Sequence, residues 1–194
     1  MSSRFNRIDS IDRTSRKGFG LIELMVTVAI LAILAMIAGP SFNTVIRGNR
    51  ASTQTNDFLS AIKYARNESI TRTRGVTICA ADTTASPVPT KCGGSNDWSK
   101  GWMVFIDDSL GATTPDPIAD ANVLRTWVGN ANNSLLPNAA QTFIRFNPRG
   151  EARADSAGAV TFTLKPKTSC SGEQQRTIVV TELGTSSSKQ VACS

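Results

Sequence analysis

Residues 16–40 have the sequence RKGFGLIELMVTVAILAILAMIAGP. Between Phe19 and Ala38 the only charged side chain is that of Glu23, and the next charged residue along the chain is Arg47. An apolar run of about 20 residues is long enough for a helix to cross a hydrocarbon core of roughly 30 Å. The stretch therefore predicts a helix that begins at Phe19 and spans a membrane over residues 19–40.

The 18 residues that precede the apolar run are basic, with five Lys and Arg side chains against two Asp. Because basic residues mark the cytoplasmic end of a membrane helix, we expect the N-terminus in the cytoplasm and the C-terminus across the membrane. An ordinary secretory signal that is cut near Ala38 is the alternative. The long leader and the acid at the start of the apolar run are unusual for such a signal.

Glu23 needs an explanation, because a carboxylate inside an apolar span is costly and marks a functional group that needs a partner. The simpler interpretation is that the span begins at Leu24 and leaves Glu23 among the lipid headgroups. The first interpretation predicts a cation that neutralises the acid, since losing either member of a buried ion pair strands a charge.

The segment Arg16–Leu24 resembles the class III signal of type IV pilins and type II secretion pseudopilins. A basic leader ends in glycine, phenylalanine follows, and an acid is the fifth residue after that junction. The resemblance implies that a prepilin peptidase cuts after Gly18 on the cytoplasmic side, N-methylates Phe19 and leaves the apolar segment on the mature protein. It also implies that Glu23 pairs with the terminal amine of a neighbouring subunit in the fibre. Gly20 stands where threonine is more usual.

The helical pattern continues beyond the apolar run. Pro40 matches a position at which pilin helices commonly carry proline, where a missing backbone hydrogen bond kinks or loosens the helix. Over residues 41–71, apolar and small residues recur at steps of three and four. These are Ala51, Thr55, Phe58, Ile62, Ala65 and Ser69. We predict that this amphipathic half of the helix packs on a soluble domain.

After Gly75 the sequence changes to short β-prone runs between turn residues. The expected strands are 76–80, 102–106, 123–128, 142–146, 160–164, 177–183 and 190–193, and the turn-rich segments are 87–89, 93–97, 115–117, 130–137 and 147–150. We predict that residues 72–194 form a β-rich domain. The predicted fold class is α+β, in which a long N-terminal helix, membrane-spanning in its first half, packs on a C-terminal antiparallel sheet.

A narrower resemblance extends beyond the helix. Residues 61–72, the strand with Cys79, residues 98–107 and residues 146–150 are similar to the FimT/GspH group of minor pilins and minor pseudopilins. The resemblance implies other major and minor pilins or pseudopilins, a prepilin peptidase and an inner-membrane assembly platform as partners. It implies a single-pass protein of the bacterial inner membrane, with its C-terminal domain in the periplasm, that later joins a pilus at the cell surface.

The four cysteines all follow the predicted membrane segment, on the side where disulfides form and persist. They are Cys79, Cys92, Cys170 and Cys193, and they allow three pairings. Local closure favours Cys79–Cys92 and Cys170–Cys193. Free buried thiols and a zinc site are alternatives, and zinc is disfavoured because the chain has neither a CxxC pair nor a histidine.

The lack of histidine excludes a Ser-His-Asp or Cys-His nucleophilic site and a histidine general base. The pairs Asp107/Asp108 and Asp116/Asp120 resemble catalytic or calcium-binding carboxylates only loosely. No EF-hand spacing follows them, and acidic loops beside Gly and Pro are usually solvated turns. We therefore predict no catalytic residue, no metal, no cofactor and no enzymatic activity.

The formal charge of +6 raises the question of nucleic-acid binding. Half of that charge lies in the leader, and the residues after Glu23 hold 16 basic and 12 acidic side chains. Some FimT-group members bind DNA through a Gly-Arg-x-Arg-type motif in the C-terminal tail, where this chain offers only Lys189. The second candidate contact is the group Arg145, Arg149 and Arg153 near a glycine turn.

Three functions thus remain open. The first is a minor type IV pilin that is incorporated into or primes the pilus, with DNA uptake in natural transformation as a further role. The second is a GspH-like minor pseudopilin of a type II protein secretion system. The third is direct DNA binding by the soluble part of the chain.

Overall fold

The computed structural model describes residues 20–82, 91–93, 95–109, 122–154 and 158–194. Within the helix, the side chains of residues 37–41 also lie outside the described part. The chain divides into two units, Met1–Phe42 and Asn43–Ser194, and each is described by itself. The predicted cleavage junction of Gly18 and Phe19 lies outside the described residues.

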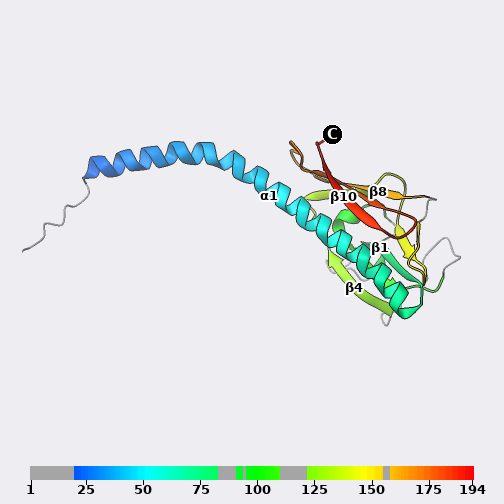
Figure 1. Cartoon of the computed structure of the whole chain (residues 1–194). Coiled ribbons are helices and arrows are strands. Elements are labelled where there is room, and N and C mark those ends of the chain that lie inside the picture. The colour runs from blue at the N-terminus through cyan, green and yellow to red at the C-terminus, as the bar shows by residue number, and fades with distance from the viewer. Residues whose placement is uncertain (1–19, 83–90, 94, 110–121, 155–157) are drawn as a thin grey trace, which may run out of the picture. The chain divides into compact units, whose positions relative to one another are not determined.

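A single α-helix, α1 (Leu21–Arg72), runs through both units (Figure 1). In the first unit, the described side chains from residue 20 to residue 36 are all exposed, and most of them are apolar. Pro40 lies within the helical backbone, in the stretch whose side chains are not described. Among the residues that the structure describes, no helix combines the length and the hydropathy that a membrane crossing requires.

The second unit is built on the amphipathic half of α1. The predicted stripe from Ala51 to Ser69 is buried along its whole length, as the periodicity predicts. Phe58 lies at its centre and makes edge-on contacts with the rings of Trp98, Trp102 and Phe162, at centroid distances of 4.9–5.5 Å. The helix therefore forms one wall of the hydrophobic core.

Two antiparallel sheets complete the second unit (Figure 1). The first has the order β4-β3-β1-β6-β7, with β2 paired to β1, and the second has the order β10-β9-β8-β5. The strands are β1 (Val76–Asp82), β2 (Lys91–Cys92), β3 (Gly101–Ile106), β4 (Val123–Val128), β5 (Asn133–Pro137), β6 (Phe143–Phe146), β7 (Ala152–Ala154), β8 (Val160–Pro166), β9 (Gln175–Val180) and β10 (Ser186–Val191). A 3₁₀ turn, η1 (Trp98–Lys100), precedes β3. The helix and antiparallel sheets together are the predicted α+β fold.

The sequence pattern was wrong at four places in the sheets, one of which is the two-residue strand β2, which was not expected. Strand β5 occupies a segment that was expected to be a turn, because its Leu135 is buried against β8 although Asn and Pro surround it. Strand β7 was not expected, and the last strand begins at Ser186 instead of residue 190. Strand β7 has only three residues and β10 has a single apolar one, so their backbone pairing with β6 and β9 decides their conformation.

Candidate functional site

The N-terminal motif is described only from residue 20 onward. Glu23 lies in the first turn of α1, and its side chain is exposed. A carboxylate in the first turn of a helix is favoured by the partial positive charge of the unpaired backbone N–H groups there. The position of Glu23 thus leaves its carboxylate available to a second positive group.

A buried ion pair lies in the first sheet, between Asp107 and Arg145. Asp107 follows β3, and Arg145 lies on β6 directly opposite Thr77 of β1. The Arg145 Nε donates to Asp107 Oδ2 at 2.9 Å, and the Thr77 hydroxyl donates to the same oxygen at 2.7 Å. The backbone N–H of Ser109 donates to Asp107 Oδ1 at 3.0 Å. Arg145 Nη2 in turn donates to the hydroxyl of Ser109 at 3.0 Å.

Burial by itself raises the pKa of the Asp107 carboxyl, but hydrogen bonds from Ser109, Thr77 and Arg145 outweigh it and hold the pKa below its ordinary value. The carboxylate is therefore charged at neutral pH although it is fully buried. Two expectations are corrected here. Asp107 does not lie in a solvated turn, and Arg145, with 2% of its side chain exposed, has no surface to offer to DNA.

The other predicted DNA contacts are exposed but do not form one basic surface. Arg149, Arg153 and the almost fully buried Arg145 line a surface pocket beside the β6–β7 turn, together with Glu151 and Glu182. Arg149 also lies 3.6 Å from the carboxylate of Glu151. Lys189 is on the edge strand β10 and does not line this pocket. The two acids balance the two exposed arginines.

Two glycine turns meet the helix at Arg66. The Arg66 Nε donates to the carbonyl of Gly150, which lies in the β6–β7 turn with φ +79°. Gly184, in the β9–β10 turn, has φ +75°, and a Cβ there would lie 2.0 Å from the Gly150 carbonyl oxygen. The Ala152 N–H donates to the Glu182 carbonyl and joins the same two turns. This junction holds both sheets to α1, and no periodicity in the sequence pointed to it.

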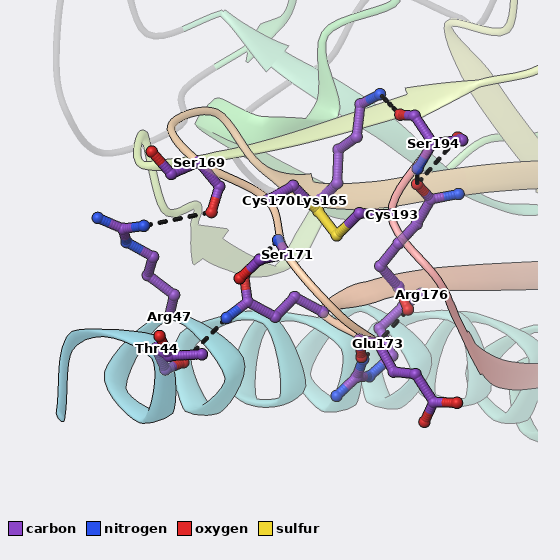
Figure 2. The surroundings of a disulfide bond; sticks show 12 residues. Thr44, Arg47, Lys165, Ser169, Cys170, Ser171, Glu173, Arg176, Cys193 and Ser194 are labelled. Carbon is purple, nitrogen blue, oxygen red and sulfur yellow. Dashed lines mark hydrogen bonds between the residues drawn. A yellow bond between two sulfur atoms is a disulfide. The ribbon is translucent and has the colours of Figure 1, made fainter. Parts of the chain in front are cut away.

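The two disulfides link the pairs that local closure favours. Cys79 pairs with Cys92 and Cys170 pairs with Cys193, with S–S distances of 1.95 and 1.88 Å. Cys79 is fully buried beside Met103 and Phe143. The second disulfide lies near the helix, where a loop between β8 and β9 and the C-terminus come together (Figure 2).

Comparison with known protein families decides the family. The family described as "Type II transport protein GspH" matches residues 54–184, which is well over half of the chain. The chain belongs to the GspH family. A second family, the prokaryotic N-terminal methylation motif, matches residues 13–39 of this GspH-family chain. The matched stretch includes the predicted cleavage junction between Gly18 and Phe19, and it includes Glu23.

Solved structures agree with the family at the level of the fold. Two crystal forms of FimU, a type IV minor pilin of Pseudomonas aeruginosa strain PAO1, match with TM-scores of 0.50 and 0.51 at 18% identity. The matches cover 71% and 73% of this chain and 91% and 89% of FimU. Comparison with curated proteins found no match.

The family and the fold are those of structural proteins, the pilins and pseudopilins. The methylation motif and the family together indicate a membrane-anchored protein with a periplasmic domain, and they indicate interaction with other pilins or pseudopilins.

Proposed function

We propose that this GspH-family protein is a minor type IV pilin that enters the inner membrane, is processed by a prepilin peptidase and then joins or primes the pilus. The N-terminal methylation motif over residues 13–39 is the observation that carries the proposal. From Leu21 onward, the motif lies on the same helix as the buried stripe that packs on the β domain. Exposed apolar side chains along residues 21–36 fit an environment of lipid or neighbouring helices.

In this proposal, cleavage after Gly18 creates a new amine at Phe19, and the peptidase methylates it. The amine of one subunit then neutralises the Glu23 carboxylate of its neighbour. Because Glu23 is exposed in the described helix, no contact within the described chain has to break first. Each subunit joins the fibre only in the axial register that pairs the two charges, since an unpaired charge in an apolar environment is costly.

We expect the mature protein, extracted from membranes, to begin with N-methylated Phe19. A Gly18→Leu variant should retain the leader, because a bulky side chain at the cut position obstructs the peptidase. Gly20→Ala is the matched control and should still be processed, since a Cβ at Gly20 meets only an ordinary contact with Ile22 at 3.9 Å. Mass spectrometry of the intact protein reads the outcome, and an N-terminus near residue 39 would reject the proposal.

A second candidate function is that of a minor pseudopilin, whose short fibre moves folded proteins out of the cell. The matched description, a type II transport protein, favours it. Deleting the gene and scoring twitching, natural transformation and release of secreted proteins separates the two candidates. We expect loss of twitching or transformation with secretion intact. Loss of secretion alone would assign the protein to the secretion machine.

Direct DNA binding is not part of the proposal. Arg145 is buried, and the pocket that Arg149 and Arg153 line also contains Glu151 and Glu182. Phosphate contacts dominate DNA affinity and require a net positive surface. The described residues show no such surface at this pocket.

A further inference from the structure

The start of the second unit is the least buried part of its helix. Residues 43–50 are all described, and none of them has a buried side chain. Burial begins at Ala51. Gly48 further weakens this stretch, because glycine is among the poorest helix formers. The apolar core therefore does not hold residues 43–50 in place.

Among the described contacts, three hydrogen bonds join this part of the helix to one segment of the β domain (Figure 2). The Gln174 Nε2 donates to the Thr44 carbonyl at 3.0 Å, and the Arg47 Nη1 donates to the Ser169 carbonyl at 3.2 Å. One turn later, Arg176 Nη2 donates to the Ser52 hydroxyl at 3.0 Å. All three partners of the helix lie between residues 169 and 176, in the loop from β8 to β9 and at the start of β9.

The Cys170–Cys193 disulfide lies within the exposed part of this loop, whose ends are held by the hydrogen bond from the Lys167 N–H to the Asn132 carbonyl and by the buried Gln174. Residues 167–169 and 171–173 are exposed, and Ser169 and Gly172 have φ of +50° and +58°. Without burial, and with a serine in the left-handed region, the loop has little intrinsic stability. The disulfide joins it to the C-terminus, where the Cys193 N–H donates to the Gly172 carbonyl at 2.9 Å.

The two disulfides differ in their protection from reductants. In the first disulfide, Cys79 is fully buried in an apolar cluster that includes Phe105, and Cys92 is partly buried against the same cluster. Cys170 and Cys193 are both partly exposed, at the edge of the unit. Because thiol–disulfide exchange requires a thiolate to reach a sulfur atom, the Cys170–Cys193 bond is the more accessible of the two.

We propose that Cys170–Cys193 is a redox-sensitive clamp that holds helix residues 44–50 on the β domain. A dithiol reductant opens it in two steps. Its first thiolate attacks one cysteine sulfur, breaks the S–S bond and forms a mixed disulfide, and its second thiolate displaces the protein sulfur. Both cysteines end as thiols after taking up two protons, and the reductant becomes a disulfide. The loop then loses its order and releases Thr44 and Arg47, while Arg176 stays paired within β9 and keeps Ser52, so residues 43–50 of α1 open more often.

The test is hydrogen exchange on the full-length chain in detergent micelles, before and after mild reduction by dithiothreitol with alkylation of the freed thiols. We expect mass spectrometry to find alkylated Cys170 and Cys193 and unmodified Cys79. Amides of residues 44–50 should exchange about tenfold faster or more, while those of β1 and β3 keep their protection. A Cys170→Ser/Cys193→Ser variant should show the same local change without any reductant.

A Gln174→Ala variant with both disulfides intact separates the loop contact from the covalent bond. It should raise exchange at residues 44–46 and at the Ser171 amide, which donates to the Gln174 side chain, and leave the rest of the loop protected. Unchanged exchange at residues 44–50 after the disulfide opens would overturn the proposal. Exchange that rises equally in β1 and β3 would also overturn it, since the disulfide would then support the whole unit instead of the helix segment. If the double serine variant does not fold, selective reduction of the native chain still gives the answer.

Discussion

Replacing Arg145 with alanine is expected to lower the free energy of unfolding by about 3–5 kcal/mol at pH 7. The change leaves the Asp107 carboxylate fully buried, with hydrogen bonds from Thr77 and Ser109 but no cation. Denaturant unfolding of the full-length chain in detergent, followed by tryptophan fluorescence, measures the loss. Arg149→Ala is the matched control and should change stability by less than about 0.5 kcal/mol, because 80% of the Arg149 side chain is exposed.

The loss of unfolding free energy caused by Arg145→Ala should be smaller at acid pH than at pH 7. In the native protein the pKa of Asp107 lies below its ordinary value, so its stabilising contribution is complete above that value and is lost as the pH falls through the lowered pKa. In Arg145→Ala, loss of the guanidinium moves the pKa of Asp107 upward from its native position, although the hydrogen bonds from Ser109 and Thr77 remain, so the carboxyl takes up a proton at a higher pH than in the native protein. The two proteins should therefore differ least in acid.

A paired substitution distinguishes a stranded charge from lost packing. Asp107→Asn combined with Arg145→Met removes both charges and keeps most of the volume, so it should recover most of the stability that Arg145→Ala loses. A native-like stability of Arg145→Ala at pH 7, or a penalty that stays constant between pH 7 and pH 3, would contradict the buried ion pair as the cause.

Gly184→Ala is expected to lower the free energy of unfolding by about 2–5 kcal/mol, from backbone strain and overpacking together. Gly184 has φ +75°, and the added Cβ would lie 2.0 Å from the Gly150 carbonyl oxygen, a backbone atom that the β6–β7 turn holds in place. The two turns must separate, which breaks the hydrogen bond from Arg66 to Gly150. Thermal unfolding of the full-length chain measures the change.

Gly172→Ala is the matched control for this substitution. Gly172 has φ +58° and nothing within 4 Å of the added Cβ, so it carries the backbone strain without the collision. Gly172→Ala should lower the free energy of unfolding by only about 1–2 kcal/mol. Equal losses of unfolding free energy in Gly184→Ala and Gly172→Ala would show that the two glycine turns can separate at Arg66 without cost. Backbone strain alone would then explain both losses.

Local patterns predicted the helix and most of the strands. The stripe from Ala51 to Ser69 was recognisable because an α-helix brings residues at steps of three and four to one face, whatever lies opposite. Strands β1, β3, β4, β6 and β8 were recognisable because their β-branched and aromatic residues stand between clear turn signals. Strand β5 was missed because only its pairing with β8 makes Leu135 a core residue.

The candidate sites divide in the same way. The two cysteine pairings could be predicted because each closes a short stretch of chain, whereas the Gly18–Phe19 junction and the pairing of Glu23 stay predictions. The burial of Arg145 could not be predicted, although one signal existed, since Arg145 interrupts the otherwise apolar run Phe143–Phe146. An arginine in such a run is either an exposed alternate residue or one half of a buried ion pair, and the chain alone does not show which.

Composition and the periods of single elements were enough to predict the N-terminal motif, the apolar helix and the α+β class. The long-range contacts arise only on folding: Asp107 with Arg145, Arg66 with the two glycine turns, and the β8–β9 loop with Thr44 and Arg47 of α1. Each of these joins residues at least 30 positions apart in the chain. Their energies depend on burial and on hydrogen-bond geometry, which exist only once the sheets and the helix have packed together.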